Sequence, residues 1–276
     1  MRIYLYIQSF FVCILSFLGL VPLHEAHSQE LSPHYNANFD LNEADHPSEF
    51  EIYKPSYGIL QYRDNELDKF GFVKFQININ KKITGGDPFG IPMELGGAYT
   101  FRALWEIMAE SSPFEDYLHN PELYVTFYKE HSLNLRVGID HESNGKAKAD
   151  SRSWNKIYIQ PRFILDLPDN ELGFHMLGIY LKSWYKLNEN RRNRDITDFY
   201  GYGELQLKFY GNNHNFFLTH SRGRKLEFGT TTLEYMYKLK NGWALYIQYF
   251  DGYGEMLLDY NKHSSSLGAG FSLLYF

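Results

Sequence analysis

The repeated alternation of polar and apolar side chains is the feature that most constrains how this chain can fold. In the last such segment Leu267, Ala269, Phe271 and Leu273 share one phase, and small or polar residues fill the other. A period of two is typical of an extended strand with one apolar face. About twelve segments of this kind, separated by turn-like residues, cover 57–63, 71–81, 95–108, 121–130, 133–143, 154–167, 173–187, 198–210, 215–221, 226–239, 242–252 and 264–276.

The composition indicates where such strands belong. Aromatic residues make up 18% of the chain, with 23 Tyr and 22 Phe, although the mean hydropathy is only -0.42. An excess of amphipathic rings suits a membrane–water boundary. After residue 28 no segment approaches the length of an apolar transmembrane helix, and an open sheet edge is not tolerated in hydrocarbon. We therefore expect an all-β fold, a twelve-stranded antiparallel transmembrane β-barrel of the bacterial outer membrane, over 56–276. A soluble barrel or sandwich with its polar residues outside is the competing interpretation.

The first residues resemble an export signal. Met1-Arg2 precedes an apolar run over 3–21, and small residues follow up to Ser28. This pattern predicts a signal peptide over 1–28, with a retained membrane helix as the alternative. The polar, aperiodic stretch over 29–55 is interpreted as an irregular periplasmic segment. The sole cysteine, Cys13, lies in the leader, so we expect the mature chain to have no disulfide.

The charge of the chain argues against one class of partner. The formal net charge is -6, whereas a nucleic-acid binder usually carries a basic excess on one face. We therefore expect no nucleic acid. One basic cluster lies in the connection over 188–197, and a solvated loop is favoured over a contact with lipid phosphates. Its members are Arg191, Arg192 and Arg194.

Strand parity predicts which connections share an end of the barrel. With the amino terminus inside, the connections at 64–70, 109–120, 142–153, 188–197, 222–225 and 253–263 lie on the outer side. Ser111 and His141 therefore belong to the same rim. The inner connection over 82–94 is unusually long for a periplasmic turn.

Three side chains at one hairpin have the chemistry of a nucleophilic hydrolase. His141 and Ser143 end the apolar phase of 133–143, and Asn155 begins the apolar phase of the following strand. A serine nucleophile needs a base, and the base needs a third group that holds its tautomer, which asparagine can supply. If the two strands pair, these groups meet beside an apolar surface. By itself, a His-x-Ser on a strand is usually structural.

The longer motif strings point to one family. His141-Glu142-Ser143-Asn144-Gly145, followed by Ser151-Arg152-Ser153-Trp154-Asn155, closely resembles the active-site segment of the outer membrane phospholipase A family. The resemblance covers most of the chain from about residue 50. Further matching stretches, in the family's order, are 73–76, 111–114, 252–255 and 258–261.

The resemblance implies a phospholipase with both A1 and A2 activity. Such an enzyme hydrolyses the sn-1 and sn-2 acyl esters of phospholipids and lysophospholipids from the outer side of the barrel wall. By position, Ser143 is the nucleophile, His141 the general base and then acid, and Asn155 the residue that orients His141. The backbone N–H of Gly145 helps to stabilise the oxyanion.

The resemblance also implies Ca²⁺ at the interface of a reversible homodimer. The matching ligand positions are Ser111 in one subunit, with the Lys146 carbonyl and the Ser151 hydroxyl in the other. Ca²⁺ accepts oxygen ligands of this kind, and a site without a carboxylate is expected to be weak. Lys146 replaces an arginine of better-known members, and Phe101 stands where an interface glutamine is expected.

Two other functions stay open at this stage. A channel or purely structural barrel is suggested by the polar phase that contains Glu204, Gln206 and Lys208. A barrel lipase for a different ester is the third hypothesis, because one sequence does not report the head group or the acyl position. Hydrolysis of a substrate panel separates these from a phospholipase.

Overall fold

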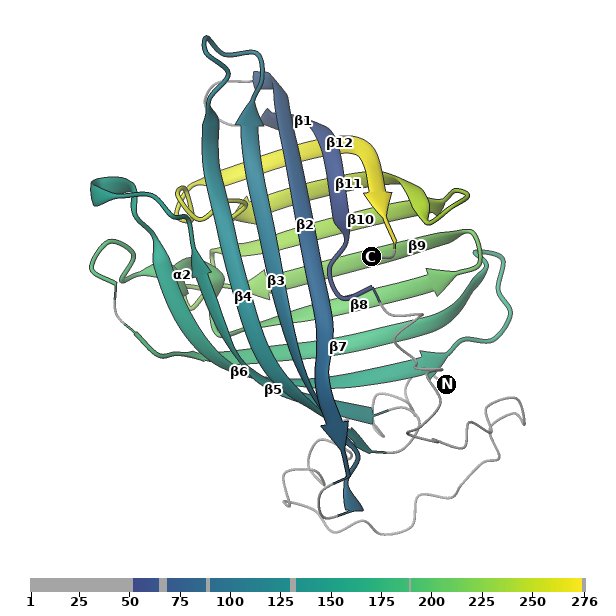
Figure 1. Ribbon diagram of the computed structural model, residues 1–276. Helices are drawn as coiled ribbons and strands as arrows, with labels where there is room; N and C mark the ends of the chain where they lie inside the picture. Colours follow the sequence, from purple (N-terminus) through teal and green to yellow (C-terminus); the bar gives the residue numbers. More distant parts are fainter. Residues whose placement is uncertain (1–51, 65–68, 88–89, 130–132, 189, 275–276) are drawn as a thin grey trace. The chain divides into compact units, whose positions relative to one another are not determined.

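The computed structural model describes residues 52–64, 69–87, 90–129, 133–188 and 190–274, and these form a closed barrel of antiparallel strands (Figure 1). The all-β fold and the twelve strands predicted from the alternation are therefore confirmed. The strands are β1 (Ser56–Asp64), β2 (Lys69–Gly86), β3 (Met93–Glu106), β4 (Phe114–Lys129), β5 (Leu133–Ser143), β6 (Ser153–Asp166), β7 (Phe174–Lys186), β8 (Gly203–Gly211), β9 (His214–Arg222), β10 (Gly229–Lys238), β11 (Trp243–Tyr253) and β12 (His263–Leu273).

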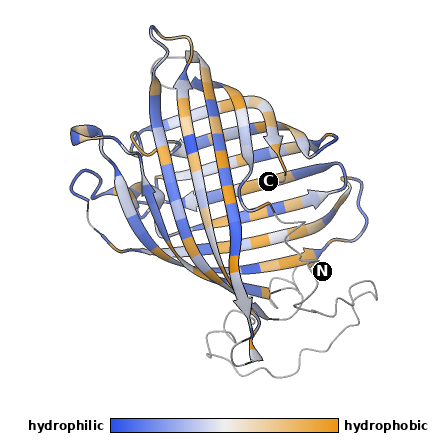
Figure 2. Cartoon of the chain, in the orientation of Figure 1, coloured by the Kyte–Doolittle hydropathy of each residue, from blue (hydrophilic) through white to orange (hydrophobic). Residues whose placement is uncertain are grey.

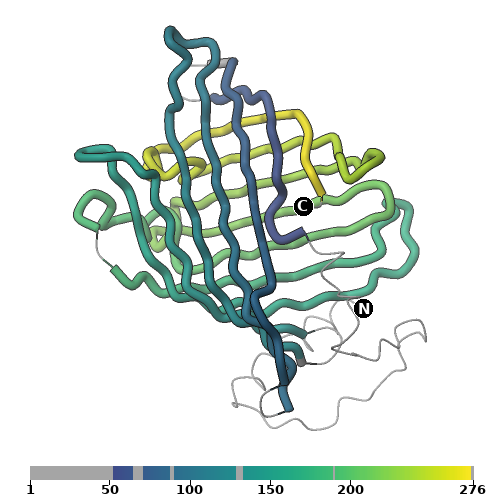
Figure 3. Tube along the Cα trace, viewed as in Figure 1, coloured from purple at the N-terminus to yellow at the C-terminus, as the bar shows by residue number. Residues whose placement is uncertain are grey.

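The barrel closes because the first strand pairs with the last. The pairing of β1 with β12 runs from Ser56 opposite Leu273 to Asp64 opposite Ser265. Each remaining pair joins consecutive strands, so the chain follows an up-and-down path that can be traced in Figure 3. Closure satisfies the backbone groups that an open edge would leave unpaired. Among the described residues, no helix has the length and apolar character needed to cross a bilayer.

The two faces of the wall separate apolar from polar side chains, as Figure 2 shows along the strands. In β11, Trp243, Leu245 and Ile247 are exposed, whereas Gln248 in the opposite phase is buried in the lumen. The same division holds in β8, where Glu204, Gln206 and Lys208 line a lumenal cavity of about 250 Å³. Exposed apolar residues therefore form the outer surface, as in outer-membrane barrels.

The eighth strand begins later than the alternation predicts. Residues 196–200 form the short helix α2 (Ile196–Tyr200), and β8 starts at Gly203, so the strand predicted from residue 198 is wrong at its beginning. Gly201 ends the helix with φ +67°, and a Cβ there would lie 1.9 Å from the carbonyl oxygen of Arg222. This close approach requires glycine, and it turns the chain before the strand starts.

The predicted long connection over 82–94 is also corrected. β2 and β3 continue as a paired hairpin, with Gly86 opposite Met93 and an irregular register between Lys82 and Thr84, and β4 stays paired with β3 as far as Met93. Only 87–92 link the two strands. The residues around Gly85-Gly86 were expected to form a loop. They are instead extended, because pairing between β2 and β3 satisfies their backbone groups.

The fourth strand begins seven residues earlier than predicted, at Phe114, and it runs through Pro121. Proline cannot donate to a strand ladder, which is why the sequence favoured Pro121 as a strand start. The structure instead places this proline in the middle of the strand, beside the hairpin that carries His141.

The predicted signal peptide over 1–28 lies outside the described residues, as does the 29–55 segment up to residue 51. Residues 52–55 contact lumenal side chains of the barrel. The Gln76 amide donates to the Pro55 carbonyl (2.7 Å), and the Lys208 ammonium donates to the Ile52 carbonyl (2.6 Å). The described end of this segment is therefore bound inside the barrel wall.

Candidate active site

The candidate site lies on the outer face of the β5–β6 hairpin. The register places His141 opposite Asn155 and Ser143 opposite Ser153. Ile139, which precedes His141 in the same phase, is 51% exposed on the apolar outer surface. The hairpin therefore brings the imidazole and the carboxamide to one end of a lipid-facing stripe, as the sequence predicts.

A hydrogen bond joins the two cross-strand partners. The His141 Nδ1 atom lies 2.6 Å from the Asn155 Oδ1 atom. An amide oxygen can only accept, so this contact requires the proton on Nδ1 and leaves the lone pair on Nε2. That tautomer is the one a general base needs.

Ser143 lies two residues beyond His141 in the same outward phase. Within the described ranges, its hydroxyl makes no hydrogen bond to His141. Contacts between a nucleophile and its base are often long before substrate binds, so the separation is compatible with catalysis. The structure brings His141 and Asn155 into contact and places Ser143 beside them.

The backbone of Asn155 is fixed by the connection that follows β7. Asn155 N–H donates to the Asn188 side-chain oxygen (2.7 Å), and Leu187 N–H donates to the Asn155 carbonyl (2.8 Å). The Asn190 amide donates to the Ser153 hydroxyl (3.0 Å). The basic residues make this connection conspicuous in the sequence, but its asparagines are the residues that contact β6. The exposed members are Arg191, Arg192 and Arg194.

The lumenal face of the same hairpin is densely bonded. Glu142, between His141 and Ser143, accepts hydrogen bonds from the Lys156 ammonium (2.7 Å) and from the Trp154 indole (2.7 Å). The buried carboxylate of Asp140 also pairs with Lys156, at 3.4 Å. Charged groups removed from water are stabilised only when they are paired in this way. The hairpin is therefore anchored from inside the barrel.

The loop after β5 is organised by Asn144, which is fully buried. Its side-chain oxygen accepts hydrogen bonds from the backbone N–H of Arg152 (2.9 Å) and Lys146 (3.3 Å). Its amide donates to the Asp150 carbonyl (2.8 Å) and to the Asp116 carboxylate (3.2 Å). Sequence analysis gave Asn144 no role, although it lies inside the motif. No sequence pattern pointed to Asp116, because it comes from another strand.

The predicted oxyanion donor sits in this loop. Gly145 has φ +63°, a conformation that favours glycine, and a Cβ there would approach the His119 ring at 3.5 Å. Its backbone N–H makes no hydrogen bond within the described part of the chain. An N–H without an internal partner beside Ser143 is the kind of donor that an oxyanion requires.

Two of the predicted Ca²⁺ ligands belong to the same loop. The Lys146 carbonyl and the Ser151 hydroxyl accept no hydrogen bond among the described residues, and the Lys146 ammonium donates instead to the Glu115 carbonyl. Ser111 lies in the connection between β3 and β4 on the same rim, exposed and with φ 61°. The described ranges contain no group of three or more His, Cys, Asp or Glu side chains arranged to hold a metal ion. Oxygens of this kind fit Ca²⁺, which binds neutral oxygen ligands.

Aromatic rings cover the outer wall next to the site. The Phe101 ring lies 5.1 Å from the His119 ring and 6.1 Å from the Tyr117 ring, between centroids. The Tyr99 hydroxyl is 2.7 Å from His119 Nδ1. Phe101, where the family resemblance leads us to expect glutamine, therefore packs among aromatic residues. An apolar surface of this kind suits acyl chains.

The outer connections are tied to one another beside the hairpin. The Arg224 guanidinium donates to the Asp198 carboxylate (2.7 Å), and the Tyr260 hydroxyl donates to Asp195 (2.5 Å). Burial opposes ionisation of Asp198, but hydrogen bonds from Arg224 and Lys225 outweigh it and lower its pKa. Burial, followed by the contact with Asp195, raises the pKa of Tyr260. These contacts hold α2 in place beside the site.

Comparison with known proteins gives one consistent result. A family model described as Phospholipase A1 matches residues 35–273. Phospholipase A1 of Escherichia coli (strain K12) is 28% identical over 209 residues, which cover 73% of this chain and 69% of that protein. Phospholipase A1 of Proteus vulgaris is 25% identical over 253 residues, which cover 84% of each chain.

Solved structures show the same likeness. Outer membrane phospholipase A from Escherichia coli aligns with a TM-score of 0.70 and 26% identity, over 84% of this chain and 95% of that one. The calcium-bound dimer of Salmonella typhi outer membrane phospholipase aligns with a TM-score of 0.68 and 25% identity, over 80% of this chain and 91% of that one.

Proposed function

Since this chain belongs to the phospholipase A1 family, we propose that it hydrolyses the sn-1 and sn-2 acyl esters of phospholipids and lysophospholipids with a Ser143, His141 and Asn155 triad. The chain is a phospholipase and an outer-membrane β-barrel. The assignment of the triad and the dependence on Ca²⁺ are the parts that we propose.

The hydrogen bond between His141 Nδ1 and Asn155 Oδ1 carries the proposal. It fixes the imidazole in the tautomer of a general base, two residues from a serine and on the apolar outer face of the wall. A purely structural histidine has no need of this tautomer beside a serine. A phospholipid in the outer leaflet meets the same face, so its ester reaches Ser143 without leaving the bilayer edge.

The chemistry follows from these positions. His141 Nε2 takes the Ser143 hydroxyl proton as the oxygen attacks the acyl carbonyl, and the Gly145 N–H stabilises the negative oxygen that forms. The intermediate then expels the glycerol-side oxygen, which receives the proton from His141. Water, activated by His141, next attacks the acyl-serine and releases the fatty acid, which restores the Ser143 hydroxyl.

We further propose that the Lys146 carbonyl and the Ser151 hydroxyl hold Ca²⁺ together with the partner subunit's Ser111. When bound, Ca²⁺ supplies positive charge that favours negative charge developing on the substrate. The proposal is supported by the two loop oxygens that lack a donor among the described residues and by the similar calcium-bound dimer from Salmonella typhi. A site completed by two subunits keeps the enzyme inactive until they meet, which is a reversible homodimer switch.

Fatty-acid release from phospholipid–detergent micelles tests this function. The folded protein is titrated with Ca²⁺ and then chelated, with a panel of phospholipids, lysophospholipids and other esters. Release that requires Ca²⁺ and is fastest for the phospholipids is the expected result. Release that is indifferent to chelation would remove the Ca²⁺ proposal, and a preference for another ester would favour the different lipase.

The lumen bears on the alternative of a channel. Charged pairs line it, including Lys182 with Asp140 at 2.8 Å and Lys74 with Glu255 at 3.0 Å. We infer that this paired network disfavours free ion flow, whereas the outer face carries the residues of the proposed triad. Conductance in planar bilayers, together with absent hydrolysis, would reverse this preference.

A further inference from the structure

A proline lies opposite the proposed general base in the strand ladder. The β4–β5 register pairs His119 with Ser143 and Glu122 with Asp140, and its continuation places Pro121 directly opposite His141. Alternate residues of an antiparallel strand direct their backbone groups to opposite neighbours. The backbone of His141 bonds either to β4 or to β6. Only if it bonds to β4 does Pro121 deprive it of a hydrogen-bond donor.

The backbone of His141 faces β4. Asn144 N–H donates to the Arg152 carbonyl of the β6 side (3.1 Å), so the even-numbered residues at this end of β5 bond to β6. The odd-numbered residues, including His141, consequently bond to β4. Pro121 has no N–H, so the carbonyl of His141 has no ladder donor at this position.

The Asn120 side chain replaces the missing donor. Its Nδ2 atom lies 3.0 Å from the His141 carbonyl oxygen and 2.8 Å from the Asp140 carboxylate. Asn120 is 3% exposed, and a buried carbonyl without a donor would be costly. One lumenal amide therefore holds the backbone of the residue whose ring acts on the outer face.

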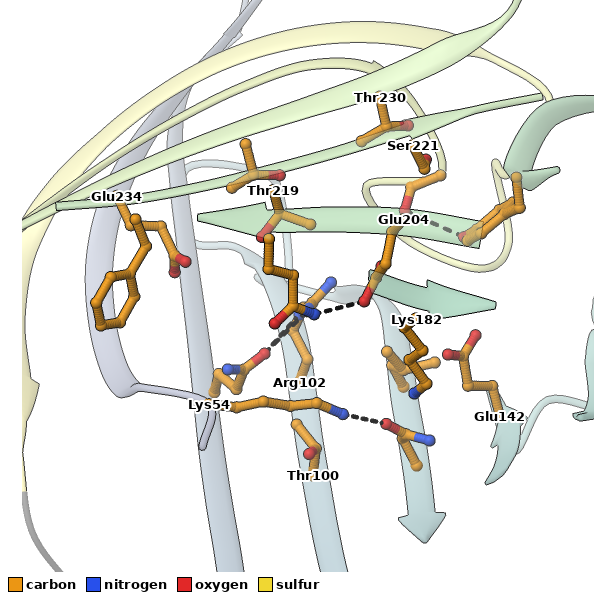
Figure 4. Close-up of a pocket in the computed structure, with 18 of the residues that line it drawn as sticks. Lys54, Thr100, Arg102, Glu142, Lys182, Glu204, Thr219, Ser221, Thr230 and Glu234 are labelled. Carbon is orange, nitrogen blue, oxygen red and sulfur yellow. Dashed lines mark hydrogen bonds between the residues drawn. The ribbon is translucent and has the colours of Figure 1, made fainter. Parts of the chain in front are cut away.

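The orientation of this amide is set from the segment before β1. The Lys54 ammonium donates to Asn120 Oδ1 at 2.7 Å, and it pairs with the buried Glu122. An ammonium can only donate and a carbonyl can only accept, so these contacts allow one orientation of the Asn120 amide. Figure 4 shows Lys54 extending into the pocket, whose lining also includes Lys182 and Glu142. Lys54 is itself held, because Lys208 donates to the Tyr53 carbonyl (2.9 Å).

We propose that Asn120 is a positioning residue for His141, and that Lys54 orients it. The inference deepens the proposed function and rests on it. Loss of the Asn120 donor frees the His141 carbonyl to move toward another partner or water. The imidazole then leaves its alignment with Ser143 and Asn155, while the apolar face that binds lipid is unchanged.

Kinetics of Asn120→Ala provide the first test. The expected result is a kcat about tenfold to a hundredfold lower with KM within about twofold, because small misplacements of a catalytic group act on turnover. The matched control is Asn78→Ala, which removes another buried lumenal amide, bonded to Thr100 at 2.8 Å. This control is expected to keep kcat near that of the parent. Equal kcat values for the two variants would overturn the proposal.

A rescue variant separates positioning from general damage. Pro121→Ala restores a backbone N–H opposite His141, so Asn120→Ala/Pro121→Ala is expected to recover most of the lost kcat. Lys54→Met keeps the Asn120 donor but releases its orientation, and a smaller loss of about threefold to tenfold is expected. A folded double variant that is no more active than Asn120→Ala would contradict the role of the ladder donor.

NMR signals of the His141 ring test the positioning role without measuring turnover. This test can therefore fail or succeed independently of the proposed function. In folded, ¹⁵N-histidine-labelled protein, the His141 ring signals are identified by their loss in His141→Gln. Asn120→Ala is expected to shift these signals, and Asn78→Ala to leave them in place. If the parent protein released no fatty acid, the proposed function would fall, and these shifts would still decide the positioning role. Unshifted signals in Asn120→Ala would overturn it.

Discussion

The two faces of the β5–β6 hairpin are built in opposite ways. On the outer face a hydrogen bond joins His141 to Asn155, and within the described part of the chain the Ser143 hydroxyl and the Gly145 N–H make no hydrogen bond. On the lumenal face Glu142 is bound by both Trp154 and a lysine, within a network of buried ion pairs. Reactive groups are left available on one side, and rigidity is supplied from the other.

Because the two faces are built differently, substitutions on them are expected to affect different properties of the protein. The proposed catalytic residues lie on the outer face, so substituting them is expected to lower the turnover rate. Residues of the lumenal face pair with buried charges, so substituting them is expected to lower the free energy of unfolding. The following predictions test this separation, beginning with the largest effect.

Ser143→Ala is expected to lower the rate of fatty-acid release by at least about 10⁴-fold, because it removes the proposed nucleophile. The melting temperature is expected to stay near that of the parent. Ser183→Ala, which removes the hydroxyl of an exposed serine on β7, is the control and should keep most activity. Normal turnover by the Ser143 variant would remove this residue from the mechanism.

Lys156→Met is expected to lower the free energy of unfolding by about 3–5 kcal/mol, because it removes the buried cation that pairs with two carboxylates of the lumenal face. The carboxylates belong to Asp140 and Glu142, and the Lys156 side chain is only 5% exposed. Denaturant unfolding of the refolded barrel measures the change. Lys262→Met, in a pair whose lysine is 72% exposed, should change it by less than about 1 kcal/mol. Similar losses for both would contradict the assigned role of the lumenal face.

Asn155→Ala is expected to lower kcat by about tenfold to a hundredfold, less than Ser143→Ala, because His141 still reaches the productive tautomer part of the time. Asn155→Asp keeps an acceptor for His141 Nδ1 and is expected to retain more activity than the alanine variant. Turnover in the same micelle assay compares them. A loss as large as that of the serine variant would show that Asn155 does more than orient the base.

Ser151→Ala is expected to raise the Ca²⁺ concentration for half-maximal activity by about tenfold, the equivalent of about 1.4 kcal/mol of lost binding, with the maximal rate nearly unchanged. The removed hydroxyl is one of the proposed oxygen ligands of the outer loop. Calcium titrations of the parent and of Ser183→Ala provide the reference. A superimposable titration for the Ser151 variant would reject the ligand assignment.

Much of the fold could be predicted because every second residue of a strand faces the same environment, so the apolar and polar faces alternate in the sequence. The alternation in 243–249 marks an outward apolar face whichever strands lie beside it. The exceptions are positions where alternation is absent or misleading. Helix α2 replaced the start of a predicted strand, and the glycine-containing end of β2 was paired where a loop was expected.

The sequence by itself determined which residues face the membrane, and its motif identified His141, Ser143 and Asn155 as one group. Only the tertiary structure decided what holds that group. Asn120 and Lys54 are 66 positions apart, and Asn188 comes from the connection after β7. Local periodicity specifies the face on which a side chain lies, but barrel register and loop path specify its partner. The contacts that support the group could therefore not be predicted from the sequence alone.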